Sequence, residues 1–241
     1  EGPAIRRNFI DFGLERLKPS FITLEEQYNR ALDQRNALIR EQNFQYFGTD
    51  MLDLWEDHLA KLGSMMVYQR QKYVEHIIPF ATSFYNELSG KKEELSLEYE
   101  GEEFSGENNG YERLKQALKE SRETDSRVGY TTVGPHRHDL HIKINGISAR
   151  TYGSQGQQRS AALSLKMAEA EVLSEYVGEK PVILLDDVMS ELDSERQDFL
   201  LNKFNGRQIF ITCCDPASVL RMVKGKTFYI RQGEIYEKTN A

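Results

Sequence analysis

The sequence predicts an α/β fold into which a long helical arm is inserted. The run from Val182 to Leu185 consists of four branched apolar residues without alternation, which is typical of a parallel strand buried on both faces. Between residues 24 and 77, apolar residues recur at spacings of three and four along two stretches. Such sustained spacing indicates two antiparallel helices packed as in a coiled coil.

The composition is that of a folded globular protein. Of the 241 residues, 29% are charged and 39% are hydrophobic, which excludes a disordered chain and allows one large or two modest domains. The formal net charge is −7, so any DNA contact must be local. No apolar run approaches the length of a membrane span and the first residues are no signal sequence, so we expect a cytoplasmic protein without a membrane partner.

Cysteine usage gives no sign of a disulfide framework or a zinc site. The two cysteines, Cys213 and Cys214, are adjacent in the sequence, and adjacent residues rarely bridge each other. We therefore expect reduced thiols that pack as small buried side chains.

The first half of the chain is predicted to be mainly helical. An N-terminal helix opened by Pro3 should be followed by two longer helices, the second of which Pro79 should kink. The predicted elements are helices to about Leu17, from Leu24 to near Gly48 and from Asp50 to Leu88, a strand near 95–99 and a helix at 111–120. We interpret residues 20–125 as an inserted helical arm that contacts DNA or a partner protein, between head segments 1–19 and 126–241.

The main sheet is then expected to resume at 128–133. A β-hairpin is predicted around Asn145-Gly146, a dipeptide that favours a two-residue turn. Three histidines, 136, 138 and 141, lie near Asp139, but alternation along an extended segment would send them to opposite faces, so we do not favour a metal site. Arg137 is a better candidate for a phosphate or DNA contact. Arg6 and Arg7 are further candidates, although a solvated helix face is the favoured explanation for them.

The chemically informative stretch runs from Thr151 to Asp193. The polar loop of residues 153–157, here called the signature loop, enters a long helix that should be buried against the sheet, so the Ser154 hydroxyl and the exposed N–H groups around Gly156 would converge on an anion. Asp186 and Asp187 end the strand that begins at Val182. That edge of a parallel sheet is where α/β folds bind ligands, and Mg²⁺ prefers carboxylate oxygens. The alternative is a helix N-terminus that attracts acidic residues.

The remaining residues are predicted to complete the sheet. The expected elements are a helix capped by Ser194 and ending near Phe204, a buried strand at 208–212, a short helix from Asp215, and a closing hairpin at 227–236.

Three motifs in this order resemble those of ABC-type ATPases. Ser154-Gln155-Gly156-Gln157 is similar to the signature S-x-G-Q, Val182 to Asp187 to a Walker B strand, and Ser190 to Asp193 to the D-loop. At a finer level the whole chain resembles the RecF family of recombination mediators. The residues that carry this resemblance are Glu1-Gly2-Pro3, Arg6-Arg7-Asn8-Phe9-Ile10-Asp11, Gln34-Arg35-Asn36, Gly134-Pro135-His136-Arg137 and Gln157-Gln158-Arg159.

The resemblance implies the C-terminal part of an ABC-type ATPase head with an inserted antiparallel helical-hairpin arm. The sequence contains no G-x-x-x-x-G-K-[ST] loop. By the resemblance, a lobe with this Walker A loop precedes Glu1, and residues 1–241 alone should be inactive. The implied cofactors are ATP and Mg²⁺. The residues implied to bind nucleotide are Ser154, Gln155, Gly156, Gln157, Asp193 and Thr212, with Asp186 at the metal and Asp187 as general base.

By the same resemblance, ATP is buried between the two protomers of a homodimer, and Ser154 and Gly156 contact the γ-phosphate held by the opposing subunit. ABC enzymes usually carry Glu at the position of Asp187 and often His at that of Thr212, so we expect a weak DNA-dependent ATPase that acts as a slow switch. The implied function is ATP-dependent DNA binding in recombinational repair, at gaps or junctions of single-stranded and duplex DNA, with RecR-like and RecO-like mediator proteins. The alternatives are a non-catalytic interaction module and an SMC-type ATPase head.

Overall fold

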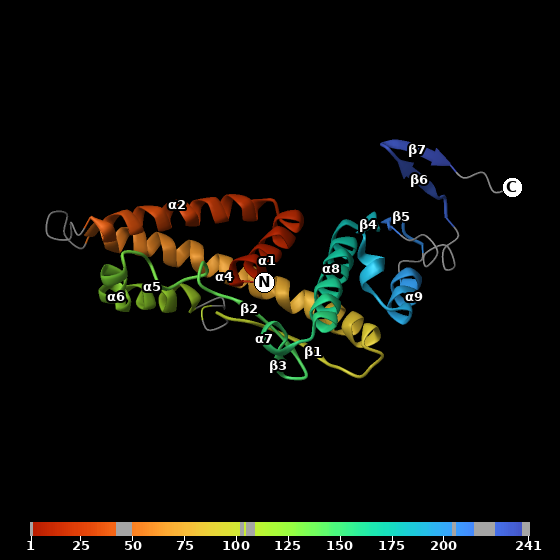
Figure 1. The fold of residues 1–241 in the computed structure, drawn as a ribbon. Helices are drawn as coiled ribbons and strands as arrows, with labels where there is room; N and C mark the ends of the chain where they lie inside the picture. The colour runs from red at the N-terminus through yellow and green to blue at the C-terminus, as the bar shows by residue number, and fades with distance from the viewer. Residues whose placement is uncertain are drawn as a thin grey trace. The chain divides into compact units, whose positions relative to one another are not determined.

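The computed structural model of the protein describes residues 2–41, 50–101, 104, 109–203, 206–214 and 225–237 (Figure 1). The chain divides into two compact units, Glu1–Glu179 and Lys180–Ala241. Within the described residues, no helix combines the length and the apolar character that crossing a membrane requires.

A pair of long helices forms the frame of the first unit. Helix α1 (Pro3–Leu17) leads into α2 (Ser20–Arg40), and α4 (Asp50–Leu88) returns alongside α2 (Figure 1). The antiparallel register is visible in two places: Arg35 meets Glu56, and a Cβ atom on Gly63 would lie 3.2 Å from the Tyr28 ring. The predicted helical hairpin is therefore confirmed, whereas the predicted end of its first helix near Gly48 lies outside the described residues.

Helix α4 is the longest element, and it continues through Pro79 to Leu88. At about 1.5 Å per residue, its 39 residues extend over roughly 58 Å. It contacts α2, α5 and β1 as well as α8, so most of the first unit packs on this single helix. Its buried positions, which include Leu59, Met66 and Ile77, follow the spacing of threes and fours that the sequence shows.

A small antiparallel sheet lies beside α4. Strands β1 (Leu95–Tyr99) and β2 (Leu140–Ile144) pair from Leu95↔Ile144 to Tyr99↔Leu140. A tight turn with Asn145 at φ 51° and Gly146 at φ 77° joins β2 to β3 (Ile147–Ser148), as a type I′ turn requires. The predicted hairpin is confirmed, but its second strand is short because Ala149–Tyr152 already form helix α7.

Helix α8 (Gln155–Val177) packs on α4 within the first unit. Its buried face carries small residues, among them Ser160, Ala161 and Ala168, which allow two helix backbones to approach closely. The helix ends at Gly178, whose left-handed backbone at φ 78° stops it at the predicted place. Within this unit, the partner of α8 is thus a helix, where the sequence had indicated a sheet.

The strand predicted at 128–133 is wrong. Residues Arg122–Val128 form helix α6, which follows α5 (Gly110–Glu120), and residues 129–139 contain no strand. Side chains, instead of a neighbouring strand, pair with the backbone of this segment. Asn36 accepts a hydrogen bond from the Thr131 N–H at 2.7 Å, and Asp125 accepts one from the Thr132 N–H at 2.9 Å. Because these groups are satisfied, residues such as Thr131 can be buried without belonging to a sheet.

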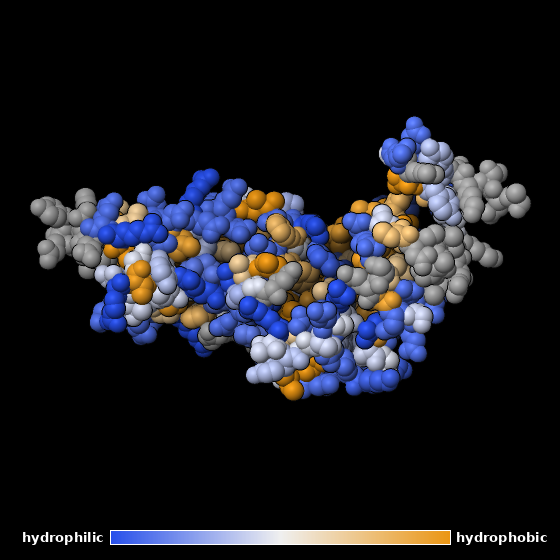
Figure 2. Space-filling view, in the orientation of Figure 1, coloured by the Kyte–Doolittle hydropathy of each residue, from blue (hydrophilic) through white to orange (hydrophobic). Residues whose placement is uncertain are grey.

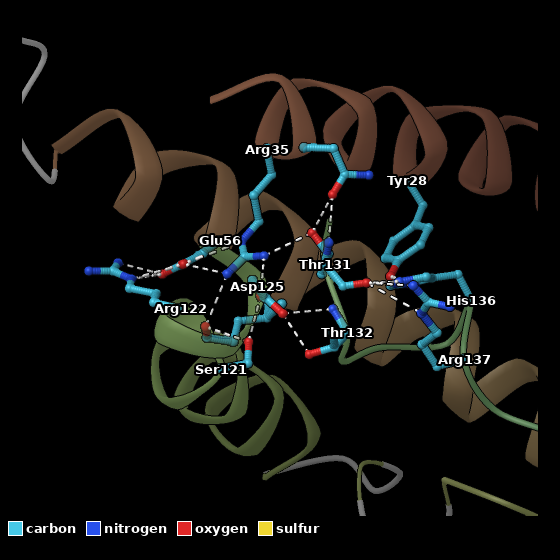
Figure 3. A network of polar contacts seen from close by, with 12 residues as sticks. Tyr28, Arg35, Glu56, Ser121, Arg122, Asp125, Thr131, Thr132, His136 and Arg137 are labelled. Carbon is cyan, nitrogen blue, oxygen red and sulfur yellow. Dashed lines mark hydrogen bonds and ion pairs between the residues drawn. The ribbon is translucent and has the colours of Figure 1, made fainter. Parts of the chain in front are cut away.

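A buried arginine connects this segment to the helical hairpin (Figure 3). Arg35 is fully buried and donates to Asp125 at 2.6 Å, to the Thr131 hydroxyl at 2.8 Å and to Glu56 at 3.0 Å. Both carboxylates are also fully buried. Arg122 makes further bonds to Glu56 from the opposite side of that carboxylate. Arg35 also donates to the Leu118 carbonyl oxygen of α5 at 3.1 Å, so five parts of the chain (α2, α4, α5, α6 and the 129–139 segment) meet at one guanidinium.

The second unit contains a two-stranded parallel sheet and a separate hairpin. Its elements are β4 (Ile183–Asp186), the 3-10 helix η2 (Val188–Glu191), α9 (Ser194–Lys203), β5 (Ile209–Thr212), β6 (Phe228–Arg231) and β7 (Glu234–Glu237). Strand β4 pairs with β5 in parallel, and β6 with β7 across a Gln232-Gly233 turn, as predicted. The short helix expected from Asp215 lies outside the described residues.

The predicted burial of β4 on both faces is wrong for this chain. Leu185 is buried, but Leu184 is 73% and Phe210 is 53% exposed, and hydrophobic residues reach the surface in the region of β5 and β6 (Figure 2). Burial on both faces requires a covering layer on each side of a sheet. Among the described residues this sheet has two strands, and one of its faces is apolar and exposed. The expected burial of both cysteines is wrong as well, because Cys214 is exposed.

We predict that Arg35→Ala lowers the free energy of unfolding by about 3–5 kcal/mol, because it leaves the buried carboxylate of Asp125 without its cation and removes one of the two arginines that pair with the buried Glu56. Urea denaturation followed by circular dichroism measures the change. Arg127→Ala is the matched control, because it removes the exposed i,i+4 pair with Glu123 and should change stability by less than about 0.5 kcal/mol. Equal losses in the two variants would contradict the role assigned to Arg35.

Candidate functional site

The signature loop is shaped by a close backbone approach and a helix cap. A Cβ atom on Gly153 would lie 2.4 Å from the Ala149 carbonyl oxygen, so the turn from α7 into the loop needs glycine at this position. Ser154 is the N-cap of α8, and its Oγ accepts a hydrogen bond from the Gln157 N–H at 3.2 Å. The Gln157 side chain in turn accepts one from the Ser154 N–H at 2.8 Å. This reciprocal capping box fixes the backbone of the loop.

The capped loop presents several hydrogen-bond donors to solvent. Ser154 and Gln155 are exposed, and the Ser154 Oγ accepts from Gln157, which leaves its own proton available for an outside acceptor. The N–H groups of Gln155 and Gly156 lie in the first turn of α8, where no carbonyl of the helix can reach them. The N-terminus of a 23-residue helix adds a partial positive charge. This combination suits a phosphate oxygen.

The cap depends on a residue that the sequence reasoning did not identify. The Gln157 Nε2 donates to a carboxylate oxygen of Glu93 at 2.7 Å. Glu93 follows α4, 64 positions before Gln157 in the sequence, and nothing in the local pattern connects them. The signature loop is therefore tied to the end of the long helix.

In the second unit, Asp186 and Asp187 lie at the carboxyl end of β4, beside Thr212 at the end of β5. The Thr212 hydroxyl donates to Asp186 Oδ1 at 2.5 Å and accepts from the Asp187 N–H at 3.0 Å. Asp187 has a left-handed backbone at φ 52°, a conformation that aspartate tolerates better than most residues. Its N–H is also within 3.2 Å of the Thr212 carbonyl oxygen, so the two strands hold this turn in place.

These carboxylates fit a magnesium ion that carries phosphate and water ligands. Asp186 is exposed, and its second oxygen, Oδ2, has no partner among the described residues of its unit. Mg²⁺ typically takes one or two protein carboxylates and keeps several waters, so a dense cluster of ligands is not needed. The described residues include no group of three or more His, Cys, Asp or Glu side chains that could hold a metal by themselves. The Thr212 proton is already used toward Asp186, so this hydroxyl orients the aspartate pair and has no second proton for a phosphate.

The D-loop residue Asp193 acts as a helix cap. Its Oδ1 accepts from the Arg196 N–H at 2.9 Å, so Asp193, and not the predicted Ser194, is the N-cap of α9. The side chains of Ser190 and Glu191 lie outside the described part of the chain.

The three candidate arginines have different surroundings. Arg6 forms a bidentate ion pair with Asp139, with hydrogen bonds of 2.8 and 2.5 Å. The hydrogen bond to this carboxylate raises the pKa of Arg6. Arg7 donates to the His138 carbonyl oxygen at 2.8 Å. Its pKa is lowered, mainly by burial and in second place by the positive charge of the nearby Arg70. Arg137 is exposed, donates to the Thr131 carbonyl oxygen and lies 4.6 Å from the centre of the Tyr130 ring. Of the three, Arg137 is the most accessible to an external phosphate.

The histidines near Asp139 have separate structural partners. The His136 Nε2 donates to the Thr131 carbonyl oxygen at 3.0 Å, so in the neutral ring Nδ1 accepts from the Tyr28 hydroxyl at 2.7 Å. The His138 Nδ1 pairs with the Tyr99 hydroxyl at 3.2 Å. Burial lowers the pKa of His136 to about 4 and that of His138 to about 3. Both rings are therefore engaged in hydrogen bonds with the protein itself.

Comparison with known proteins gives a consistent set of relatives. No model of a protein family matches the chain. The chain is similar to the DNA replication and repair protein RecF of Clostridium acetobutylicum, with 38% identity over 239 residues, 98% of this chain and 65% of that protein. RecF of Alkaliphilus oremlandii is 38% identical over 242 residues with the same shares, and RecF of Lachnoclostridium phytofermentans is 41% identical over 212 residues, 88% and 57%. The chain thus spans about 65% of the length of the first two relatives.

Two solved structures are similar to the whole chain. One is described as the recombination mediator protein RecF with ATP in the RecFOR pathway, at a TM-score of 0.86 and 37% identity. The other is described as RecF-ATPrS in the same pathway, at a TM-score of 0.85 and 37% identity. Each likeness covers 99% of this chain and 64% of the solved chain.

We predict that the free energy of unfolding falls when the pH is lowered from 7 to 5. The pKa values of His136 and His138 in the folded protein lie below the unfolded value of 6.5, so the unfolded chain binds more protons in the window from about 6.5 down to about 4. Stability that is complete above about pH 6.5 is therefore lost as the pH falls through this window. Burial raises the pKa of Glu25, which opposes the effect in part.

Urea denaturation at the two pH values measures this difference. His136→Gln, which keeps a donor for the Thr131 carbonyl oxygen but does not titrate, should make the pH dependence shallower. Equal or greater stability at pH 5 in the wild-type protein would contradict the neutral assignment of the two rings.

Proposed function

Because this chain belongs to the RecF family of DNA replication and repair proteins, we propose that the protein containing it is an ATP-dependent DNA-binding protein of recombinational repair that dimerises on ATP. The observation that carries the proposal is the capped signature loop. Its hydroxyl and backbone donors are held ready for an anion, yet the described residues of its own unit contribute no nucleotide cradle at the loop. A loop of this kind is suited to bind a phosphate group that a second protein surface holds.

In the proposed dimer, Ser154 and Gly156 of each protomer contact the γ-phosphate of ATP held by the other. The donors are positioned before the nucleotide arrives, and this preorganisation stabilises the charge on the transferring phosphoryl group. Gln155 and Gln157 frame the contact, and Asp193 belongs to the same nucleotide interface through its place in the D-loop. Closure of the dimer would then depend on ATP.

The aspartate edge supplies the chemistry of hydrolysis. Asp186 would hold Mg²⁺, which offsets phosphate charge when it is bound with ATP. Asp187 would orient the attacking water and accept its proton. The carboxylate of aspartate reaches less far than that of the glutamate usual in ABC enzymes, which supports slow turnover suited to a timed switch.

We propose DNA with single-stranded and duplex segments, and RecR-like and RecO-like mediator proteins, as the partners. This part of the proposal is supported by the pathway given for the RecF structures. On the chain itself, Arg137 is the most exposed of the three candidate arginines, and the helical arm offers a further surface for a partner. A net charge of −7 requires that DNA contact be local.

We predict that Ser154→Asp abolishes ATP-dependent dimerisation of the full-length protein. Aspartate is a good N-cap and preserves the start of α8, but its charge would repel the γ-phosphate. Ser154→Thr is the matched control, because it keeps both the cap and the hydroxyl and should dimerise on ATP. Analytical ultracentrifugation with and without ATP measures the dimer. If ATP does not change the oligomeric state of the wild-type protein, the clamp proposal fails and the interaction-module alternative stands.

We predict that Asp187→Asn reduces ATP hydrolysis by the full-length protein at least tenfold and leaves ATP-dependent dimerisation intact. Asparagine keeps the shape of the side chain but cannot accept the proton of the attacking water. Single-turnover hydrolysis of ATP, beside the dimerisation assay, separates the two steps. An unchanged hydrolysis rate would show that Asp187 is not the general base.

A further inference from the structure

The carboxylate of Glu93 lies between the long helix and the signature loop, and it belongs to neither. We propose that Glu93, supported by Tyr85 of α4, is a positioning residue that presets the signature loop for nucleotide contact. This inference rests on the proposed function of that loop. Neither Glu93 nor Tyr85 belongs to the signature, Walker B or D-loop motifs.

A continuous chain of hydrogen bonds leads from α4 to Ser154. The Tyr85 hydroxyl, on a fully buried side chain, donates to Glu93 Oε2 at 2.7 Å. The other oxygen, Oε1, accepts from the Gln157 Nε2 at 2.7 Å. The Gln157 Oε1 then accepts from the Ser154 N–H at 2.8 Å. Each oxygen of Glu93 thus has one defined donor.

The position of Glu93 is itself fixed by the turn that follows α4. The Ser89 hydroxyl bonds to the Glu93 carbonyl oxygen at 3.3 Å, and the turn contains left-handed residues at Gly90 and Lys91. The next residue, Glu94, exchanges two hydrogen bonds with Asn145, each at 2.8 Å. The carboxylate is therefore anchored both to the end of α4 and to the β2–β3 turn.

Glu93 determines which way the Gln157 amide faces. An amide group can be turned over, which exchanges its donor and its acceptor. In the turned state the amide oxygen would face the Glu93 carboxylate, and the NH₂ group would face the Ser154 N–H, so both contacts would be repulsive. The carboxylate excludes that state and keeps the acceptor directed at Ser154. It thereby completes the capping box and fixes the residue proposed to contact phosphate.

This arrangement couples the arm to the loop. Tyr85 belongs to the same helix as Glu56, which pairs with Arg35 in the hairpin. A displacement of α4 that moves the Tyr85 hydroxyl changes the hydrogen bonding of Glu93 and, through Gln157, the order of the loop. A partner bound to the arm could thus be sensed at the nucleotide contact.

A set of variants of the full-length protein tests the proposal. Glu93→Ala removes both carboxylate oxygens, so we expect Ser154 and Gln157 amide hydrogen exchange to become roughly tenfold faster and ATP-dependent dimerisation to weaken by a similar factor. Glu93→Gln keeps an acceptor oxygen for the Gln157 Nε2, and its NH₂ group can donate to the Tyr85 hydroxyl, so both readouts should stay near the wild-type values. Tyr85→Phe removes the hydrogen bond that supports Glu93 and should have a smaller effect than Glu93→Ala.

Glu94→Ala is the matched control, because it makes the same truncation one position away on an exposed side chain and should leave both readouts unchanged. Unaltered exchange in Glu93→Ala, or a Glu93→Gln variant as defective as Glu93→Ala, would overturn the proposal. The exchange experiment is done without nucleotide. It therefore still decides the role of Glu93 if the wild-type protein fails to dimerise on ATP, an outcome that would refute only the proposed function.

Discussion

Buried guanidinium groups paired with carboxylates hold the first unit together. Arg35 joins α2 to α4, α6 and the irregular 129–139 segment, and Arg70 joins α4 to Asp11 of α1 and to the Pro135 carbonyl oxygen of the same segment. The segment has no strand to pair with, so its backbone groups would be costly to bury without these partners. The position of α4 relative to its neighbours follows from that requirement.

The signature loop depends on the same helix by a second route. Helix α8 packs on α4, and Glu93, in the turn that follows α4, orients the amide that caps α8. The loop is therefore built as an extension of the arm and not as an isolated turn. A phosphate contact assembled in this way is ordered in advance, which is what stabilisation of a developing charge requires.

Local chemistry made much of the fold predictable. The Asn145-Gly146 and Gln232-Gly233 turns, the spacing along α4 and the entry of the polar 153–157 loop into a long helix each carry their own signal over a few residues. Three features carried no such signal. Residues 128–133 have a strand-like composition, but side chains from remote positions replaced the strand partner. Arg35 occupies a core position between Ala31 and Ile39 on α2, where sequence reasoning expects an apolar residue. Glu93 acts on Gln157 across 64 positions, a contact that only the folded chain brings about.

The central claim is that the signature loop is a preset contact for the nucleotide of a second protomer. A structure of the full-length dimer with bound ATP tests it most directly. The account predicts that the Ser154 Oγ and the Gly156 N–H lie within about 3 Å of γ-phosphate oxygens held by the opposing protomer. It also predicts that Gln157 still bonds to Glu93. A nucleotide-bound dimer in which residues 154–157 face solvent and contact neither of the two bound ATP molecules would contradict the claim.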